Sequence, residues 1–222
     1  VLIVHASNFS EQIIDYLNLN FANIRIIHWF WNPVSVLNKI EFKDNNSELW
    51  SFDKNDCEKF DMKYNTTRYF RFPVDTTLVN KGDVIFIGYD KGRRSFLEEL
   101  QTIFNKKYIK TKFIILEKGD KNIPYYDVLR YILEFSVILD ILQDGQQGNS
   151  LRPMESIFFR KKLVTNDRRI VDMDFYSSEN IFVLGMDNID MLYSFIKQPY
   201  VEIDKSIVEK YDFDNWVNRF FI

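Results

Sequence analysis

The stretch from Val137 to Asn166 constrains the fold most, because it places a helical pattern between two short apolar runs. The apolar run at 137–142 is short enough for a buried strand, and a polar loop with two glycines follows it. Ser150 suits the N-cap of a helix, and a second strand is expected at 162–165. Strand, glycine loop, helix and strand form a βαβ unit. Its loop lies at the carboxyl end of the first strand, where open α/β sheets bind ligands.

The same alternation runs through the whole chain and predicts an α/β fold with parallel strands. The expected strands are residues 1–5, 24–30, 48–52, 68–72, 84–88, 112–116, 137–142, 162–165 and 180–184. Helical patterns are expected at 9–17, up to Lys39, after Asp53, and at 96–104, 125–133, 189–196 and 203–221.

The pattern changes near residue 80, which predicts two halves, 1–80 and 81–222. A length of 222 residues allows one large domain or two small ones, at about 150 residues per domain. Four strands in the first half make only a small layer, so the N-terminal half is expected to be small or truncated. The chain starts directly with an apolar strand pattern and without Met, which leaves open whether an upstream segment is missing.

Composition excludes several classes of protein. The net charge of −3 gives no overall basic footprint for nucleic acid. The single cysteine, Cys57, excludes an internal disulfide framework and fits a reducing compartment. No apolar run is long enough to span a bilayer. Two histidines and one cysteine at scattered positions show no metal-ligand spacing, so neither a metal nor a cofactor is expected.

Gln147 and Glu155 have a spacing that resembles the E-x7-E stretch of many glycosyltransferases of the B fold. In those enzymes the loop and the helix start hold the nucleotide-sugar, and the second glutamate binds the ribose hydroxyls. Here Gln147 stands in place of the first glutamate and Glu155 keeps the second.

The wider string is similar to bacterial lipopolysaccharide and capsule glycosyltransferase-like proteins, over roughly residues 25–215 and most strongly after residue 84. The matching segments are Leu139-Asp140-Ile141, Gln147-Gly148, Arg152 to Glu155, Lys162 to Asn166 and Asp174-Phe175-Tyr176. Without this resemblance, the stretch reads as any flavodoxin-like or Rossmann-like βαβ unit.

The resemblance implies two Rossmann-like halves of the glycosyltransferase B type. Residues 1–80 would form the acceptor side, and residues 81–222, with closing C-terminal helices, would bind the nucleotide-sugar. The implied activity is metal-independent transfer of a sugar to a surface polysaccharide or lipopolysaccharide, in the cytoplasm or at the inner face of the membrane. The partners would be the nucleotide-sugar, as substrate, and a saccharide or lipid-linked acceptor. The alternative is a non-catalytic nucleotide-sugar-binding or partner-binding subunit of polysaccharide biosynthesis. A receiver-like signalling module fits less well, because no acidic cluster with a following lysine is found.

The first group of candidate site residues follows the strand that ends at Gly88. Lys91 and Arg93 match the basic pair that neutralises the leaving diphosphate in B-fold glycosyltransferases, with Arg94 as a substitute. Charge-assisted hydrogen bonds of this kind are strong, and arginine can bind phosphate with two of them. The same residues could instead form a solvated turn before a helix.

The second group of candidate site residues lies in the loop and helix start of the central βαβ unit. Its members are Gln147, Gly148, Asn149, Ser150, Arg152 and Glu155. If Glu155 binds the ribose as the resemblance implies, both of its carboxylate oxygens should be free to accept from the ribose hydroxyls. Ser150 could serve only as a cap, Arg152 as a surface cation and Glu155 as a first-turn acid that suits the helix dipole.

Two further polar residues stand out. Asp140 lies inside an apolar run, and a buried carboxylate is costly unless it is paired, so a structural role toward the loop is expected. His5 ends the first strand and is the candidate catalytic base, with Asp53 as an alternative. The motif match reaches neither of these two candidate bases, and His28 is expected to pack inside a strand.

Overall fold

The computed structural model describes residues 1–6, 11–21, 23–34, 47–143 and 150–222. These residues form two compact units, of which the first consists of Val1–Arg68 and Asp214–Ile222 and the second of the remainder. The expected division near residue 80 therefore lies at 68–69 instead. The chain also returns to the first unit at its C-terminal end, where the sequence predicted one continuous second half.

The first unit contains a four-stranded parallel sheet in the order β1-β2-β3-β4. Its strands are β1 Leu2–His5, β2 Ile26–Phe30, β3 Ser47–Ser51 and β4 Lys63–Tyr64. The helices in this part are α1 Glu11–Asn20 and α2 Lys54–Phe60. Asp53 opens α2 as predicted, because its carboxylate accepts from the backbone N–H groups of Asn55 and Asp56. The short helix expected up to Lys39 lies outside the described residues.

The predicted strand at 68–72 is wrong. The fourth strand of the sheet is β4, and Tyr69 forms only an isolated parallel bridge with Asp212. The apolar pattern arose because the aromatic rings of this segment pack individually against different partners. Phe70, for example, stacks on Phe213 with ring centroids 4.1 Å apart. In a single sequence, aromatic residues that pack in this way look the same as the apolar residues of a buried strand.

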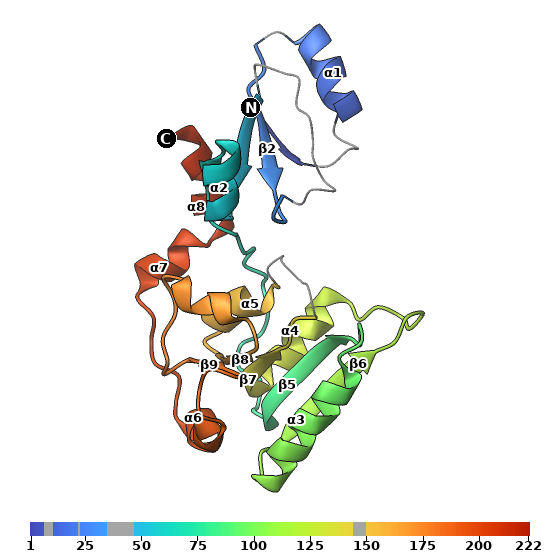
Figure 1. The fold of residues 1–222 in the computed structure, drawn as a ribbon, viewed down its shortest axis with the longest axis vertical. Helices are drawn as coiled ribbons and strands as arrows, with labels where there is room; N and C mark the ends of the chain where they lie inside the picture. Colours follow the sequence, from blue (N-terminus) through green and yellow to red (C-terminus); the bar gives the residue numbers. More distant parts are fainter. Residues whose placement is uncertain (7–10, 22, 35–46, 144–149) are drawn as a thin grey trace. The chain divides into compact units, whose positions relative to one another are not determined.

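The C-terminal segment completes the core of the first unit. The ring of Trp216 lies edge-on to Trp29 at 5.1 Å, and Phe220 lies 4.8 Å from Trp50. Arg25, just before β2, donates a hydrogen bond to the carbonyl oxygen of Phe220 at 2.5 Å. Figure 1 accordingly shows both chain ends in the first unit.

The second unit contains a five-stranded parallel sheet in the order β6-β5-β7-β8-β9. Its strands are β5 Gly82–Tyr89, β6 Thr111–Leu116, β7 Phe135–Asp140, β8 Lys162–Thr165 and β9 Ile181–Val183. All five strands predicted for this half are confirmed, because buried parallel strands appear as nearly continuous apolar runs.

Helices cover both faces of this sheet (Figure 1). The longer ones are α3 Arg94–Lys106, α4 Tyr125–Leu133, α5 Arg152–Phe158, α6 Leu192–Lys197 and α7 Lys205–Lys210. The helices α4 and α5 share one apolar core with the sheet, and α3 and α6 share another. Neighbouring residues of a strand point to opposite faces, so Ile138 belongs to the first core and Leu139 to the second.

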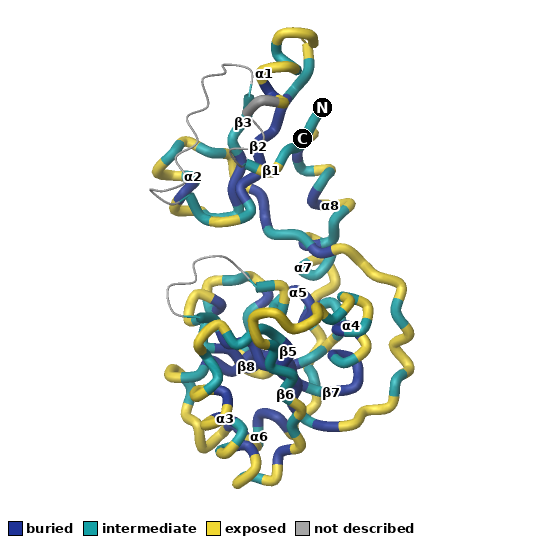
Figure 2. Tube along the Cα trace, turned by 90° about the vertical axis from the view of Figure 1, so that its right-hand side faces the viewer, coloured by how far each residue is buried: buried dark blue, intermediate teal, exposed yellow. Residues whose placement is uncertain are grey.

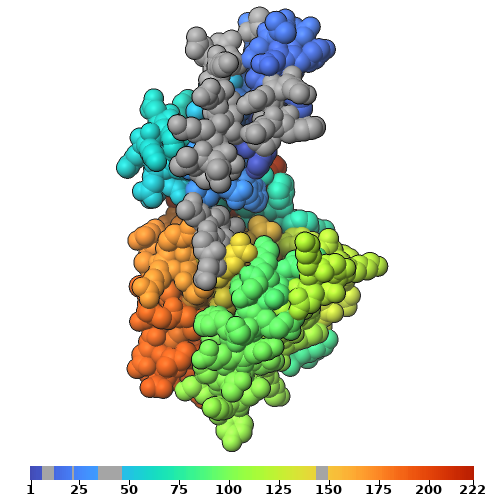
Figure 3. Space-filling view, turned by 45° about the vertical axis from the view of Figure 1, so that its right-hand side comes forward, coloured from blue at the N-terminus to red at the C-terminus, as the bar shows by residue number. Residues whose placement is uncertain are grey.

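The burial pattern follows from this layering. The strand β8 is dark blue in the tube of Figure 2 and β5 is a mixture of dark blue and teal, whereas loop residues around them are yellow. In Figure 3 the green surface of α3 and the orange surface of the later segment are both visible on one face of the second unit. No helix in the described part of the chain is long and apolar enough to cross a membrane.

The strand order locates the expected ligand site. The chain runs from β5 outward to β6 and then returns to the other side of β5 to form β7. This order is that of flavodoxin-like doubly wound sheets, and the direction reverses between β5 and β7. Ligands of open α/β sheets bind outside the carboxyl ends of the strands at such a switch point.

Candidate functional site

A cavity of about 320 Å³ lies at this switch point. It is formed by the carboxyl ends of β5 and β7 and the start of α5. Six candidate residues predicted from the sequence line it: Gly88, Lys91, Arg93, Ser150, Arg152 and Glu155. The candidates Gln147, Gly148 and Asn149 lie outside the described residues. The structure therefore brings together the described members of both predicted groups.

The turn after β5 is shaped by two residues with positive φ. Lys91 has φ 49° and Gly92 has φ 80°, and this backbone course is uncommon for a lysine. The carboxylate of Asp90 accepts from the N–H of Arg94 at 2.6 Å, which starts α3. Lys91 is thus held at the tip of a tight turn between β5 and α3, at the border of the cavity.

Lys91 is the exposed cation of the site. Among the described residues, its ammonium has neither a hydrogen-bond partner nor an ion-pair partner. A ligand phosphate could therefore bind Lys91 without breaking an existing described contact.

Arg93 occupies a different environment. Its guanidinium donates to the backbone carbonyls of Asp90 at 3.1 Å, Tyr89 at 2.5 Å and Ile141. These bonds connect the end of β5 with the residue that follows β7. Burial lowers the pKa of Arg93, although the nearby Asp140 and Asp90 partly oppose this. An arginine has five N–H donors, so two remain for a ligand.

Arg152 and Glu155 form a buried ion pair in the first turn of α5. Glu155 is 0% exposed, and its second carboxylate oxygen accepts from the hydroxyl of Tyr125 at 2.9 Å. Arg152 also donates to the carbonyl of Ile87 at 3.0 Å. Burial alone would lower the pKa of Arg152, but the Glu155 carboxylate more than offsets this and raises it. The prediction that both oxygens of Glu155 are free is wrong, because Arg152 and Tyr125 occupy them.

Ser150 and Asp140 form a second pair at the cavity. The hydroxyl of Ser150 accepts from the N–H of Arg152 at 3.1 Å, a local turn contact. The prediction that Ser150 is the N-cap is wrong by one residue, because the cap of α5 is Leu151, whose side chain makes no capping hydrogen bond. The Ser150 hydroxyl also donates to the carboxylate of Asp140 at 2.8 Å. Burial raises the pKa of Asp140 to about 6, against the effect of this hydrogen bond. The carboxylate at the end of β7 thus holds the start of α5, which agrees with the structural role expected for it.

The predicted catalytic base is not supported by the geometry. His5 is an exposed residue at the end of β1, and no side chain in the described part of the chain orients its imidazole. Asp53, the alternative, is used as the cap of α2. His28 is fully buried in β2, as expected.

Tyr125 is the site residue that sequence reasoning missed. The helical pattern at 125–133 includes it only as one of its apolar positions. Its ring is partly buried, and its hydroxyl lies 3.0 Å from that of Tyr69 as well as donating to Glu155. Burial raises the pKa of Tyr125 well above its usual range, and the negative charge of Glu155 adds to this. A tyrosine in a buried stripe needs a partner for its hydroxyl, and this was the available signal.

The charges of the cavity favour an anion. Lys91, Arg93 and Arg152 contribute three positive charges, while Asp140 and Glu155 contribute at most two negative ones. Glu155 already neutralises Arg152. No group of His, Cys, Asp and Glu residues that could hold a metal ion is present in the described ranges.

Comparison with known proteins adds no family assignment: no family model matches the chain, and no curated protein matches it.

Proposed function

We propose that the switch-point cavity binds the nucleotide part of a nucleotide-sugar. On this proposal the chain is a metal-independent glycosyltransferase of the B type, acting in the cytoplasm or at the inner face of the membrane on a surface polysaccharide or lipopolysaccharide acceptor. The observation that carries the proposal is the meeting of two distant segments. The candidates Gly88, Lys91 and Arg93 come from one segment and Ser150, Arg152 and Glu155 from the other, and all six line one cavity.

The size and charge of the cavity support a phosphate-bearing small molecule. Its volume of about 320 Å³ lies at the lower end of the range for small-molecule sites. The exposed ammonium of Lys91 at the border of the cavity supports pairing with a diphosphate, and the charge and two remaining donors of Arg93 support it further. Cations aimed at a leaving diphosphate stabilise the charge that develops in the transition state.

One observation favours the second candidate function, a non-catalytic nucleotide-sugar-binding or partner-binding subunit. Both oxygens of Glu155 already accept from Arg152 and Tyr125, and the residue is fully buried, so a ribose would have to compete with these partners for the contact seen in the resembling enzymes. Gln147 also replaces the first glutamate of their motif. A subunit that binds the donor without transferring its sugar would tolerate both differences.

Calorimetry with UDP, GDP, ADP, CMP and their sugars tests the proposal. The best nucleotide should bind Lys91→Met about tenfold more weakly than the unchanged chain, because one charge-assisted contact is lost. The corresponding nucleoside should bind both equally. Lys106→Met is the matched control, since Lys106 is exposed in the last turn of α3 and does not line the cavity.

The outcomes separate the two functions. Slow hydrolysis of a bound sugar nucleotide supports the transferase, and binding without any turnover supports the subunit. If no nucleotide binds, or if Lys91→Met weakens the binding of nucleoside and of nucleoside diphosphate equally, the proposed site is wrong.

A further inference from the structure

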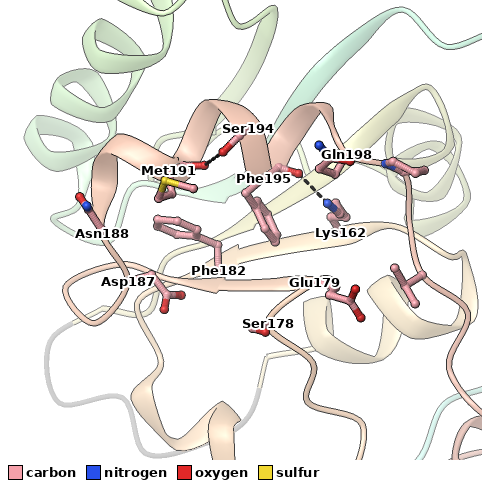
Figure 4. A pocket seen from close by; sticks show the side chains of 12 residues that line it. Lys162, Ser178, Glu179, Phe182, Asp187, Asn188, Met191, Ser194, Phe195 and Gln198 are labelled. Atoms are coloured by element: carbon pink, nitrogen blue, oxygen red, sulfur yellow. Dashed lines mark hydrogen bonds between the residues drawn. The ribbon is translucent and has the colours of Figure 1, made fainter.

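A second and larger cavity, of about 560 Å³, lies between β9 and the segment that contains α6. Figure 4 shows the rings of Phe182 and Phe195 inside this cavity, with Met191 next to Phe182. The two rings pack against each other with centroids 5.4 Å apart. None of the residues that line this cavity lines the switch-point cavity. The second cavity is therefore a separate feature of the second unit.

A buried lysine also lines this cavity, next to the ring of Phe195. Lys162 is only 2% exposed, and its ammonium donates to the carbonyl of Phe195 at 2.5 Å (Figure 4). The ammonium is also 4.3 Å from the centroid of the Phe195 ring. It has three N–H donors, and Phe195 supplies the one hydrogen-bond acceptor described for it.

No carboxylate of the described residues forms an ion pair with Lys162. Burial lowers the pKa of Lys162, and the more distant Glu179 opposes this only in part. A buried charge is costly unless a counter-charge accompanies it. An anion inside the cavity would supply both the missing charge and further acceptors.

The acidic residues of the rim favour an anion with a single charge. Asp187 and Glu179 both line the cavity and add negative potential. The carboxylate of Asp187 is engaged, because it accepts from the N–H of Val183 at 2.6 Å, whereas Glu179 is exposed. One lysine facing two acids suits a carboxylate better than a doubly charged phosphate.

The edge of β9 is closed to an added peptide strand. The N–H of Val183 is used by Asp187, and its carbonyl accepts from the N–H groups of Met186 and Asp187 at 3.0 and 2.9 Å. The N–H of Ile181 donates to the carbonyl of Ser177. Strand addition needs these groups free, so the cavity suits a compact molecule better than an extended chain.

We propose that this cavity binds a small monocarboxylate with a flat apolar body. The carboxylate accepts from the ammonium of Lys162, and the body lies against Phe182, Phe195 and Met191. Aromatic rings provide large apolar area and favour stacked or edge-on partners of the same kind. The volume of about 560 Å³ lies well inside the range for small-molecule sites.

Two probes of the same shape test the proposal on the full chain: indole-3-acetate and its uncharged analogue indole-3-acetamide. The acid should bind about tenfold more tightly than the amide, and Lys162→Met should abolish that preference while the amide still binds. Lys161→Met is the matched control. The neighbouring Lys161 does not line this cavity and donates to Leu133 instead, so its removal should leave the preference intact.

A second variant guards against misfolding of Lys162→Met. Met191 is 58% exposed, so Met191→Glu should fold normally. Its new negative charge should weaken binding of the acid more than binding of the amide. The proposal is overturned if acid and amide bind the unchanged chain equally, or if neither binds at millimolar concentration. It is also overturned if tryptamine binds more tightly than the acid, or if Lys161→Met rather than Lys162→Met removes the preference. That last result would place the anion in the adjacent cavity of about 300 Å³, which both lysines border.

Discussion

The substitution Glu155→Gln should destabilise the second unit strongly. Glu155 is fully buried, paired with Arg152 and hydrogen-bonded by Tyr125. Removing one partner of a buried ion pair costs about 3–5 kcal/mol, because the other charge is left uncompensated. Glutamine keeps one oxygen that can still accept from Arg152, so we expect the lower end, about 3 kcal/mol. For a chain of this size, that corresponds to a fall in Tm of about 6–12 °C.

Urea and thermal unfolding measure this effect, and an exposed pair provides the control. Glu98 is 61% exposed and lies 4.0 Å from Arg94 on the same helix, so Glu98→Gln should cost less than about 0.5 kcal/mol. Adding Arg152→Met to Glu155→Gln should restore part of the loss, because both charges are then gone. A loss below about 1 kcal/mol for Glu155→Gln, or no recovery in the double variant, would refute the assignment of Glu155 as a buried structural partner.

Three further predictions concern other charges of the two units. Burial raises the folded pKa of Asp140 to about 6, so the fold loses stability as the pH rises from about 4 through 6. Relative to the unchanged chain, the free energy of unfolding of Asp140→Asn should therefore rise by on the order of 2–3 kcal/mol between pH 4 and pH 8, as measured by urea titrations. If the two free energies differ by the same amount at both pH values, the prediction is wrong. The hydrogen bond from Arg25 lowers the pKa of Glu48 to about 2, so its contribution is present above pH ~4 and is lost as the pH falls. Glu48→Gln should destabilise the first unit at pH 7 by about 1–3 kcal/mol and much less near pH 2, as followed by circular dichroism. Arg93→Met should cost at least about 2 kcal/mol of unfolding free energy through its three carbonyl bonds, and Lys91→Met almost none; equal losses would show that Arg93 has no special structural role.

The second sheet could be predicted from sequence because its strands are buried on both faces. Residues such as Ile138 and Leu139 are both apolar although they enter different cores, so the strand appears as one uninterrupted run. The segment 68–72 has a similar composition for another reason. Its rings contact individual partners in the folded chain, and a single sequence does not distinguish the two cases.

The location of the candidate site could be predicted, but its internal contacts could not. Parallel strands place their carboxyl ends at one edge, so Lys91 and Ser150 had to come close if both strand assignments were right. The partners of Arg93 are backbone carbonyls. Every residue has a backbone carbonyl, so the residue types in the sequence do not indicate these partners. The hydroxyl that reaches Glu155 comes from Tyr125 on the preceding helix α4, and only the folding of α4 and α5 into one core brings it there.

The discontinuity of the first unit sets an order for folding during synthesis. The ribosome releases Tyr69–Phe213 before Asp214–Ile222, so the second unit can assemble while the first still lacks Trp216 and Phe220. During that interval the rings of Trp29 and Trp50 have no C-terminal cover. The strands of the first unit are thus synthesised first, but the core that covers them is completed last. A nascent chain stalled before residue 214 should expose these strands to chaperones.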